Sequence, residues 1–188
     1  IDIQPGEEGI VKVTAVKQAG GDAERTEIVM EQDADGGVRV KTEFHKRWEW
    51  FFDWRSPCPV EYTIRVPRAC TIKARGVSCD IAVQGLQGEI DVKVVSGDVQ
   101  LRDLAGRVQA VTVSGDISGE GLGGPLEVET VSGDVELTQS SFATVQGKTV
   151  SGDVRLEVLP GPGPYRFKSV SGGMDLALPA GGGCAGEM

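Results

Sequence analysis

Apolar and polar residues alternate along most of this chain, and a repeated five-residue phrase organises the alternation in its second half. The phrase is Val-Ser-Gly-Asp-Val or a close variant, and successive copies begin 18, 18, 18, 19 and 20 residues apart. A period near 20 residues is typical of repeat architectures, in which each unit buries its apolar face by stacking on its neighbours. The copies are Val77–Ile81, Val95–Val99, Val113–Ile117, Val131–Val135, Val150–Val154 and Val170–Met174.

Each repeat predicts two short strands joined by two corners. Within each repeat, apolar side chains recur at every second position in two short runs, and a polar or glycine-rich break follows each run. Alternation of this kind is strand periodicity. One complete copy contributes Ile81, Val83, Leu86, Ile90, Val92 and Val94. One corner is the phrase itself, and the other carries Gly88, Gly106 or Gly124, where we expect backbone dihedrals that favour glycine.

These repeats fit either a parallel solenoid or an antiparallel meander. The solenoid is favoured, because identical phrases at constant spacing place like residues over one another only when successive strands run the same way. We therefore predict an all-β fold, a parallel two-sheet β-solenoid of about six or seven coils over residues 59–180. Residues 59–76 read as an imperfect first coil, with Ile64 and Val66 beneath Ile81 and Val83.

The region before the repeats predicts a different arrangement within one single domain, 1–188. Alternating apolar residues in 10–16, 28–30 and 38–44 are separated by turn-forming glycine and aspartate, which indicates antiparallel strands over residues 1–58. We expect the last residues, 181–188, to form a flexible tail.

Composition narrows the class of partner. The net charge of −9 and pI near 4.7 argue against nucleic acid, whose phosphates attract Lys and Arg. No apolar run is long enough for a transmembrane segment, and the first residue, Ile1, leads us to expect that a leader or anchor once preceded it. Four cysteines without a CxxC pair and one histidine make a structural zinc site improbable, so no cofactor is predicted.

The repeated phrase, together with the lead-in Val60-Glu61-Tyr62-Thr63-Ile64-Arg65-Val66-Pro67, resembles a bacterial adhesin-like domain family, an uncharacterised group with tandem SGD repeats. The resemblance covers nearly the whole chain. It implies a right-handed β-helix-like fold of two flattened sheets and no established catalytic residues. Two copies depart from the pattern, with Cys79 in place of the glycine and Gly173 in place of the aspartate.

The aspartates of the phrase would form a ladder at intervals of about 4.8 Å, at which unsolvated carboxylates repel one another. One interpretation is that each side chain accepts backbone N–H bonds at its own corner. The alternative is a row of weak cation sites, because calcium binds carboxylate oxygens. The residues concerned are Asp98, Asp116, Asp134 and Asp153, with Asp80 beneath them.

Most of the aromatic residues lie in one short stretch that begins near Phe44. They either cap the open end of the first coil or form a binding loop for a protein, glycan or membrane interface. The candidate partner-binding residues are Trp48, Trp50, Phe51, Phe52 and Trp54.

Two states of the cysteines stay open. They are free thiols, or Cys58 and Cys79 form a disulfide, since the stacking register brings Cys58 close to the first corner, whereas Cys70 aligns with the opposite corner near Gly88. At Cys79 itself, a left-handed conformation would cost a non-glycine residue about 1–2 kcal/mol.

These observations favour a non-catalytic function. His45 lies outside the repeats, so no serine of the corners has an obvious activating base. The expected function is an extracytoplasmic or envelope-associated adhesion or scaffold module with a protein or glycan partner. The alternatives are a cytoplasmic or membrane-proximal sensory module of an envelope-stress system, and a degenerate polysaccharide-active β-helix.

Overall fold

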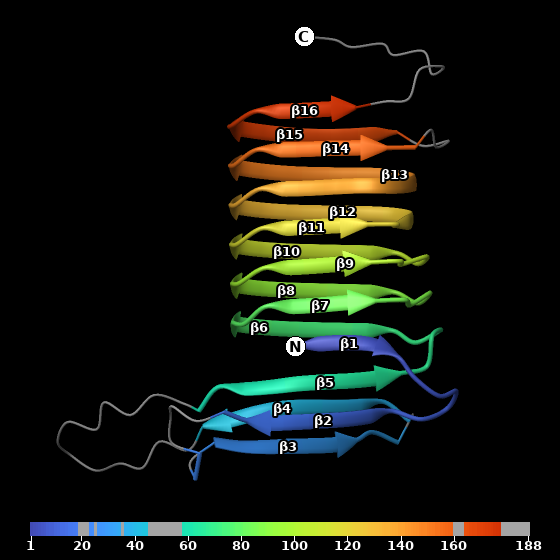
Figure 1. The fold of residues 1–188 in the computed structure, drawn as a ribbon, viewed down its shortest axis with the longest axis vertical. Coiled ribbons are helices and arrows are strands. Elements are labelled where there is room, and N and C mark those ends of the chain that lie inside the picture. Colours follow the sequence, from blue (N-terminus) through green and yellow to red (C-terminus); the bar gives the residue numbers. More distant parts are fainter. Residues whose placement is uncertain (19–22, 25, 35, 45–57, 160–163, 178–188) are drawn as a thin grey trace, which may run out of the picture.

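The protein is a tall column of stacked β-strands with no helix in the described residues (Figure 1). This computed structural model describes residues 1–18, 23–24, 26–34, 36–44, 58–159 and 164–177. The predicted aromatic segment from Trp48 to Trp54 and the tail 181–188 lie outside these ranges. The predicted parallel solenoid is confirmed, with about six turns.

The solenoid has two sheets, whose strands alternate along the chain. We call first sheet the one with β7 (Ile81–Gln84), β9 (Val99–Arg102), β11 (Ile117–Glu120), the first part of β13 (Val135–Ser151), β14 (Val154–Val158) and β16 (Met174–Ala177). The second sheet contains β6 (Ile72–Ser78), β8 (Ile90–Ser96), β10 (Val108–Ser114), β12 (Gly123–Ser132), the later part of β13 and β15 (Tyr165–Ser171).

Within each sheet, the inward-pointing residues of successive turns lie directly over one another and fill the space between the two sheets. In the second sheet Ile90 pairs with Val108, which pairs with Leu126, and all three are at most 3% exposed. Each inward column is therefore a continuous apolar stack, and no turn could bury its own residues without the turns above and below.

The N-terminal strands add a second arrangement at one end of the column. β2 (Lys12–Lys17) pairs antiparallel with β5 (Val60–Val66), and β3 (Thr26–Gln32) forms an antiparallel hairpin with β4 (Val38–Phe44), as the sequence predicts. The hairpin contacts the sheet through Thr42 and Tyr62, whose side-chain oxygens share a hydrogen bond. It is not hydrogen-bonded to the second sheet within the described residues.

The predicted first coil is wrong in one respect. β1 (Asp2–Pro5) is inserted between β5 and β7 and runs parallel to both, so that Ile3 pairs with Ile64 on one side and with Val83 on the other. Ile64 and Val66 therefore do not lie directly beneath Ile81 and Val83. The N-terminal segment supplies a rung of the first sheet, and Ile3 is only 3% exposed.

Candidate functional site

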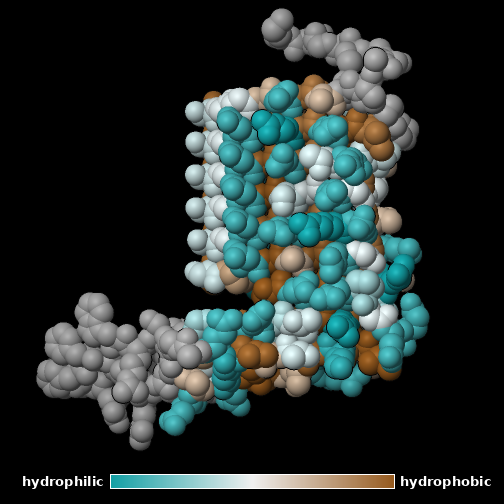
Figure 2. All heavy atoms as spheres, viewed as in Figure 1, coloured by the Kyte–Doolittle hydropathy of each residue, from teal (hydrophilic) through white to brown (hydrophobic). Residues whose placement is uncertain are grey.

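The corner formed by the repeated phrase is held together by its aspartates. The backbone N–H of Asp116 donates to Oδ1 of Asp98 at 2.9 Å, and the N–H of Asp134 donates to Oδ1 of Asp116 at 2.8 Å. The same bond links Asp98 to Asp80, Asp153 to Asp134 and Gly173 to Asp153. The aspartates accept backbone bonds, as the first interpretation states, but the donor N–H belongs to the next corner and not to their own. Figure 2 shows this corner as regular columns of hydrophilic and near-neutral residues along one edge.

The ladder does not gather the ligand set that a cation site needs. Each carboxylate uses one oxygen for the next corner, and within the described ranges no group of three or more His, Cys, Asp or Glu side chains is arranged to hold a metal ion. Calcium normally takes six to eight oxygen ligands. The aspartates of the phrase are therefore explained by backbone hydrogen bonding.

The glycine of the phrase is required by the close approach of successive corners. Gly115 has φ of +147°, and a Cβ atom there would overlap the carbonyl oxygen of Gly97 in the corner below. Cys79 is the lowest member of this column and does not have positive φ, so the strain expected there is absent. At the opposite corner, Gly88 and Gly106 also lack positive φ, so the expected dihedral reason is wrong for them. They are required because a Cβ would overlap a carbonyl oxygen of the strand connection below.

Of the two states that the sequence leaves open, the described cysteines are free thiols, and Cys58 and Cys79 do not form a disulfide in this structure. The Sγ of Cys58 donates to the carbonyl of Gln18 at 2.7 Å. The Sγ of Cys79 lies so close to Gly76 that a Cβ atom on residue 76 would overlap it. Burial raises the pKa of the Cys70 and Cys79 thiols above the ordinary value of 9.0. Raised pKa values keep both thiols protonated near neutral pH and therefore weak nucleophiles.

A column of exposed valines runs along the second sheet beside the repeated corner. These are the first residues of each phrase, and their side chains are 46% to 71% exposed. Six valines about 4.8 Å apart make an apolar strip roughly 24 Å long. We call this column the valine ridge; it consists of Val77, Val95, Val113, Val131, Val150 and Val170.

Sequence analysis did not single out the valine ridge, although the signal is present. The last inward residues of one repeat are Ile90, Val92 and Val94, so the next phrase, which begins at Val95, starts one residue after an inward position and its first side chain must point outward. Thr112, for example, is 1% exposed, whereas the adjacent Val113 is 46% exposed. Exposed apolar columns on a rigid sheet typically mark contact surfaces.

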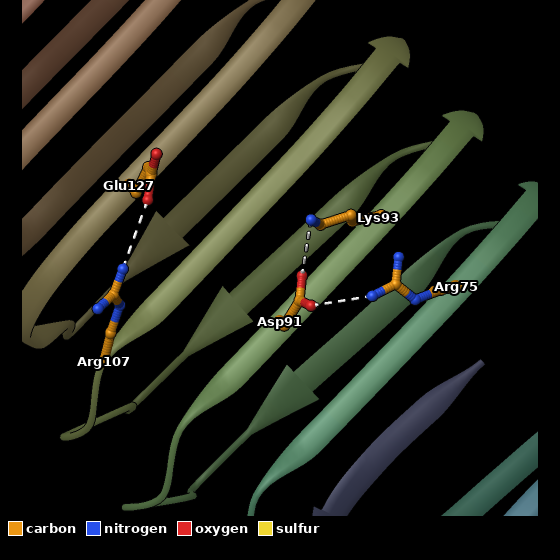
Figure 3. Close-up of polar contacts among 5 residues, drawn as sticks. All are labelled: Arg75, Asp91, Lys93, Arg107 and Glu127. Atoms are coloured by element: carbon orange, nitrogen blue, oxygen red, sulfur yellow. Dashed lines mark hydrogen bonds and ion pairs between the residues drawn. The ribbon is translucent and has the colours of Figure 1, made fainter.

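Charged side chains occupy many of the other outward positions of the second sheet, beside uncharged residues such as Gln109 and Val111. Asp91 of β8 lies between Arg75 of β6, at 3.2 Å, and Lys93 of β8, at 3.7 Å, while Arg107 reaches Glu127 at 3.7 Å (Figure 3). Pairs this exposed contribute about 0–1 kcal/mol each, so they specify surface charge more than stability.

An apolar cleft of about 450 Å³ opens where the second sheet ends and the N-terminal hairpin begins. Val38 and Val40 of β4 lie on one side of it, Ile72 and Ala74 of β6 on the other. The first sheet contributes residues that include Ile1, Ile3, Val13, Ile64 and Val66. Sequence reasoning did not predict this cleft, because it results from the way β1 and β5 offset the two sheets.

The sequence matches the Toastrack family, DUF4097, over residues 1–182. The chain belongs to this family. Membership agrees with the solenoid that the resemblance implies, whereas adhesion is not part of the family description. No curated protein and no solved structure gave a match. The described part of this Toastrack protein contains no helix that could cross a membrane.

Proposed function

We propose that this Toastrack protein is a non-catalytic scaffold of the bacterial cell envelope, outside the cytoplasm, whose second sheet binds a protein or glycan partner. The valine ridge carries the proposal. It places six apolar side chains in register on a sheet that cannot flex independently of its core.

The absence of a catalytic role is part of the same proposal. Asp116 and the equivalent aspartates have a backbone partner in the next corner, and Gly115 and its equivalents serve the close packing of corners. The residues that recur most regularly in the sequence are thus used to build the fold. Binding through the outer surface needs no residue with a special pKa.

Co-sedimentation with a cell-envelope fraction from the protein's own host tests the proposal. Replacing Val95, Val113 and Val131 together by Thr keeps the β-branched shape but removes apolar surface. We expect the triple variant to lose at least about tenfold in apparent affinity, which corresponds to about 1.4 kcal/mol. Val16→Thr is the matched control, because Val16 is 53% exposed on β2, away from the valine ridge, and should bind normally.

Unchanged binding of the triple variant would refute the role of the valine ridge. Fractionation of the host cells with an antibody to the native protein tests localisation separately. Recovery in the envelope fraction is expected, and recovery only in the cytoplasmic fraction would contradict an envelope function.

A further inference from the structure

The cleft between β6 and β4 is bordered by two strand edges that have no partner among the described residues. Among the described strands, the backbone of β6 pairs only with β8, and the backbone of β4 pairs only with β3. Figure 1 shows β6 on the column side of this region, β4 on the other side, and both arrows pointing the same way. Because neither strand bonds to the other, their separation exceeds one interstrand spacing of about 4.8 Å. The next separation that is compatible with a continuous sheet is two such spacings, which leaves room for one strand between β6 and β4.

The backbone of β6 is already oriented toward such a strand. The N–H of Ile72 donates to the carbonyl of Glu89 at 2.8 Å and so points toward β8. In a parallel sheet the direction of the backbone groups alternates from residue to residue. The N–H and C=O groups of Lys73 and Arg75 therefore point toward the cleft.

The inner surface of the cleft is the end of the apolar stack of the second sheet, where the residues of β6 have a covering neighbour on the β8 side only. Ile72 lies in register with Ile90, which is 0% exposed, but Ile72 itself is only partly buried. Ala74 is 9% exposed, although its neighbour in register, Val92, is 0% exposed. An additional strand with apolar side chains pointing inward would cover these residues and Ile64 opposite them.

The outward positions along the rims of the cleft carry four cations and one acidic residue, although the protein as a whole carries a net charge of −9. Lys73 and Arg75 occupy outward positions of β6 and line the cleft, while Arg39, Lys41 and Glu43 occupy the outward positions of β4 that alternate with Val38 and Val40. Arg75 and Arg39 have acidic neighbours, whereas Lys41 and Lys73 form no ion pair with another described residue. Outward side chains of a strand in the cleft would lie between Lys73 of β6 and Lys41 of β4, which would attract acidic residues.

We propose that this cleft binds one extended peptide segment of a partner protein, in which apolar side chains alternate with acidic ones. The segment completes the second sheet between β6 and β4 by strand addition. Main-chain hydrogen bonds to both edges supply affinity, and the two faces of the strand supply selectivity. Since β4 and β6 run in the same direction, the segment has the same orientation relative to both. This site lies at the free edge of β6, the strand that also carries Val77 of the valine ridge, but its binding does not require the ridge.

Peptide binding to the whole chain tests the charge preference. The probes are labelled Glu-Val-Glu-Ile-Glu-Val-Glu, its counterpart with Lys in place of every Glu, and Glu-Glu-Val-Ile-Val-Glu-Glu, which has the same composition without the alternation. We expect the alternating acidic peptide to bind at least about tenfold more tightly than the other two. The Lys41→Glu/Lys73→Glu variant should reverse the order of the acidic and basic peptides.

A matched variant controls for net charge. Lys148→Glu/Lys168→Glu makes the same change in total charge on neighbouring β13 and β15, at the opposite end of the column. It should leave the peptide order unchanged. If the acidic peptide does not bind, or if both double variants respond alike, the proposed site is wrong, while the valine-ridge experiment remains unaffected.

Amide hydrogen exchange identifies the edge that is used. Addition of the acidic peptide should protect the N–H groups of Lys73 and Arg75, whereas Ala74, which points toward β8, should already be protected. A peptide methylated on its backbone nitrogens should give no protection. If Lys73 and Arg75 are protected without peptide, the proposal is overturned: loss of that protection on dilution identifies a second copy as the occupant, and protection at every concentration identifies the chain itself.

Discussion

Replacement of Gly115 by Ala tests the physical reason for the repeated phrase. The new Cβ would overlap the carbonyl oxygen of Gly97, and neither atom can rotate away, because the backbone of the stacked corners fixes the positions of both. The two corners must separate. Three hydrogen bonds donated by backbone N–H groups join them: Gly97 N–H to the Ser114 carbonyl at 3.0 Å, Val99 N–H to the Asp116 carbonyl at 2.9 Å, and Asp116 N–H to Asp98 Oδ1 at 2.9 Å.

The expected loss of stability follows from two terms. A side chain at positive φ costs about 1–2 kcal/mol. Loss of three hydrogen bonds at about 1 kcal/mol each adds roughly 3 kcal/mol. Gly115→Ala should therefore lower the free energy of unfolding by about 4–5 kcal/mol in total.

Gly36→Ala separates these two terms. Gly36 has φ of +83°, but an added Cβ would meet no heavy atom within 4 Å. This control should lose only the conformational term of about 1–2 kcal/mol. Urea denaturation followed by far-ultraviolet circular dichroism measures both variants. If Gly115→Ala is no more destabilising than Gly36→Ala, close packing of the corners is not what requires glycine.

Two further predictions concern the ladder and the thiols. Asp116→Asn keeps an oxygen that can accept the Asp134 N–H, so it should change stability by less than about 0.5 kcal/mol, whereas Asp116→Ala should cost about 1 kcal/mol or more in urea denaturation. Equal losses for the two would mean that the hydrogen bond is not the contribution that matters. Burial raises the pKa of the Cys70 and Cys79 thiols in the folded protein. The stability that the protonated thiols contribute is therefore complete below the pKa that they have in the unfolded chain, and it is lost as the pH rises through their pKa in the folded protein. Iodoacetamide should therefore modify both more slowly in the folded protein than in urea at pH 8 to 9, and equal rates would contradict the raised pKa values.

The solenoid was predictable because its information is local and repeated. Spacings of 18 to 20 residues and the alternation around Ile81, Val83, Ile90 and Val92 specify two strands per turn, and identical turns can bury their apolar faces only by stacking in register. That the Asp116 side chain accepts a backbone bond was predictable, since a short polar side chain at a corner has backbone groups within reach. That the donor is Asp134 in the next corner was not, because it depends on how the turns stack.

The sequence by itself determined the repeat, the inward columns and the chemistry of the repeated corner. Only the tertiary structure decided that Ile3 lies between Ile64 and Val83, because pairing of a non-repetitive strand depends on distant partners that no local period encodes. That insertion offsets the two sheets, and it leaves β6 without a neighbour on one side among the described residues. The cleft beside Lys73 is therefore a property of how the strands are assembled, which no single stretch of sequence specifies.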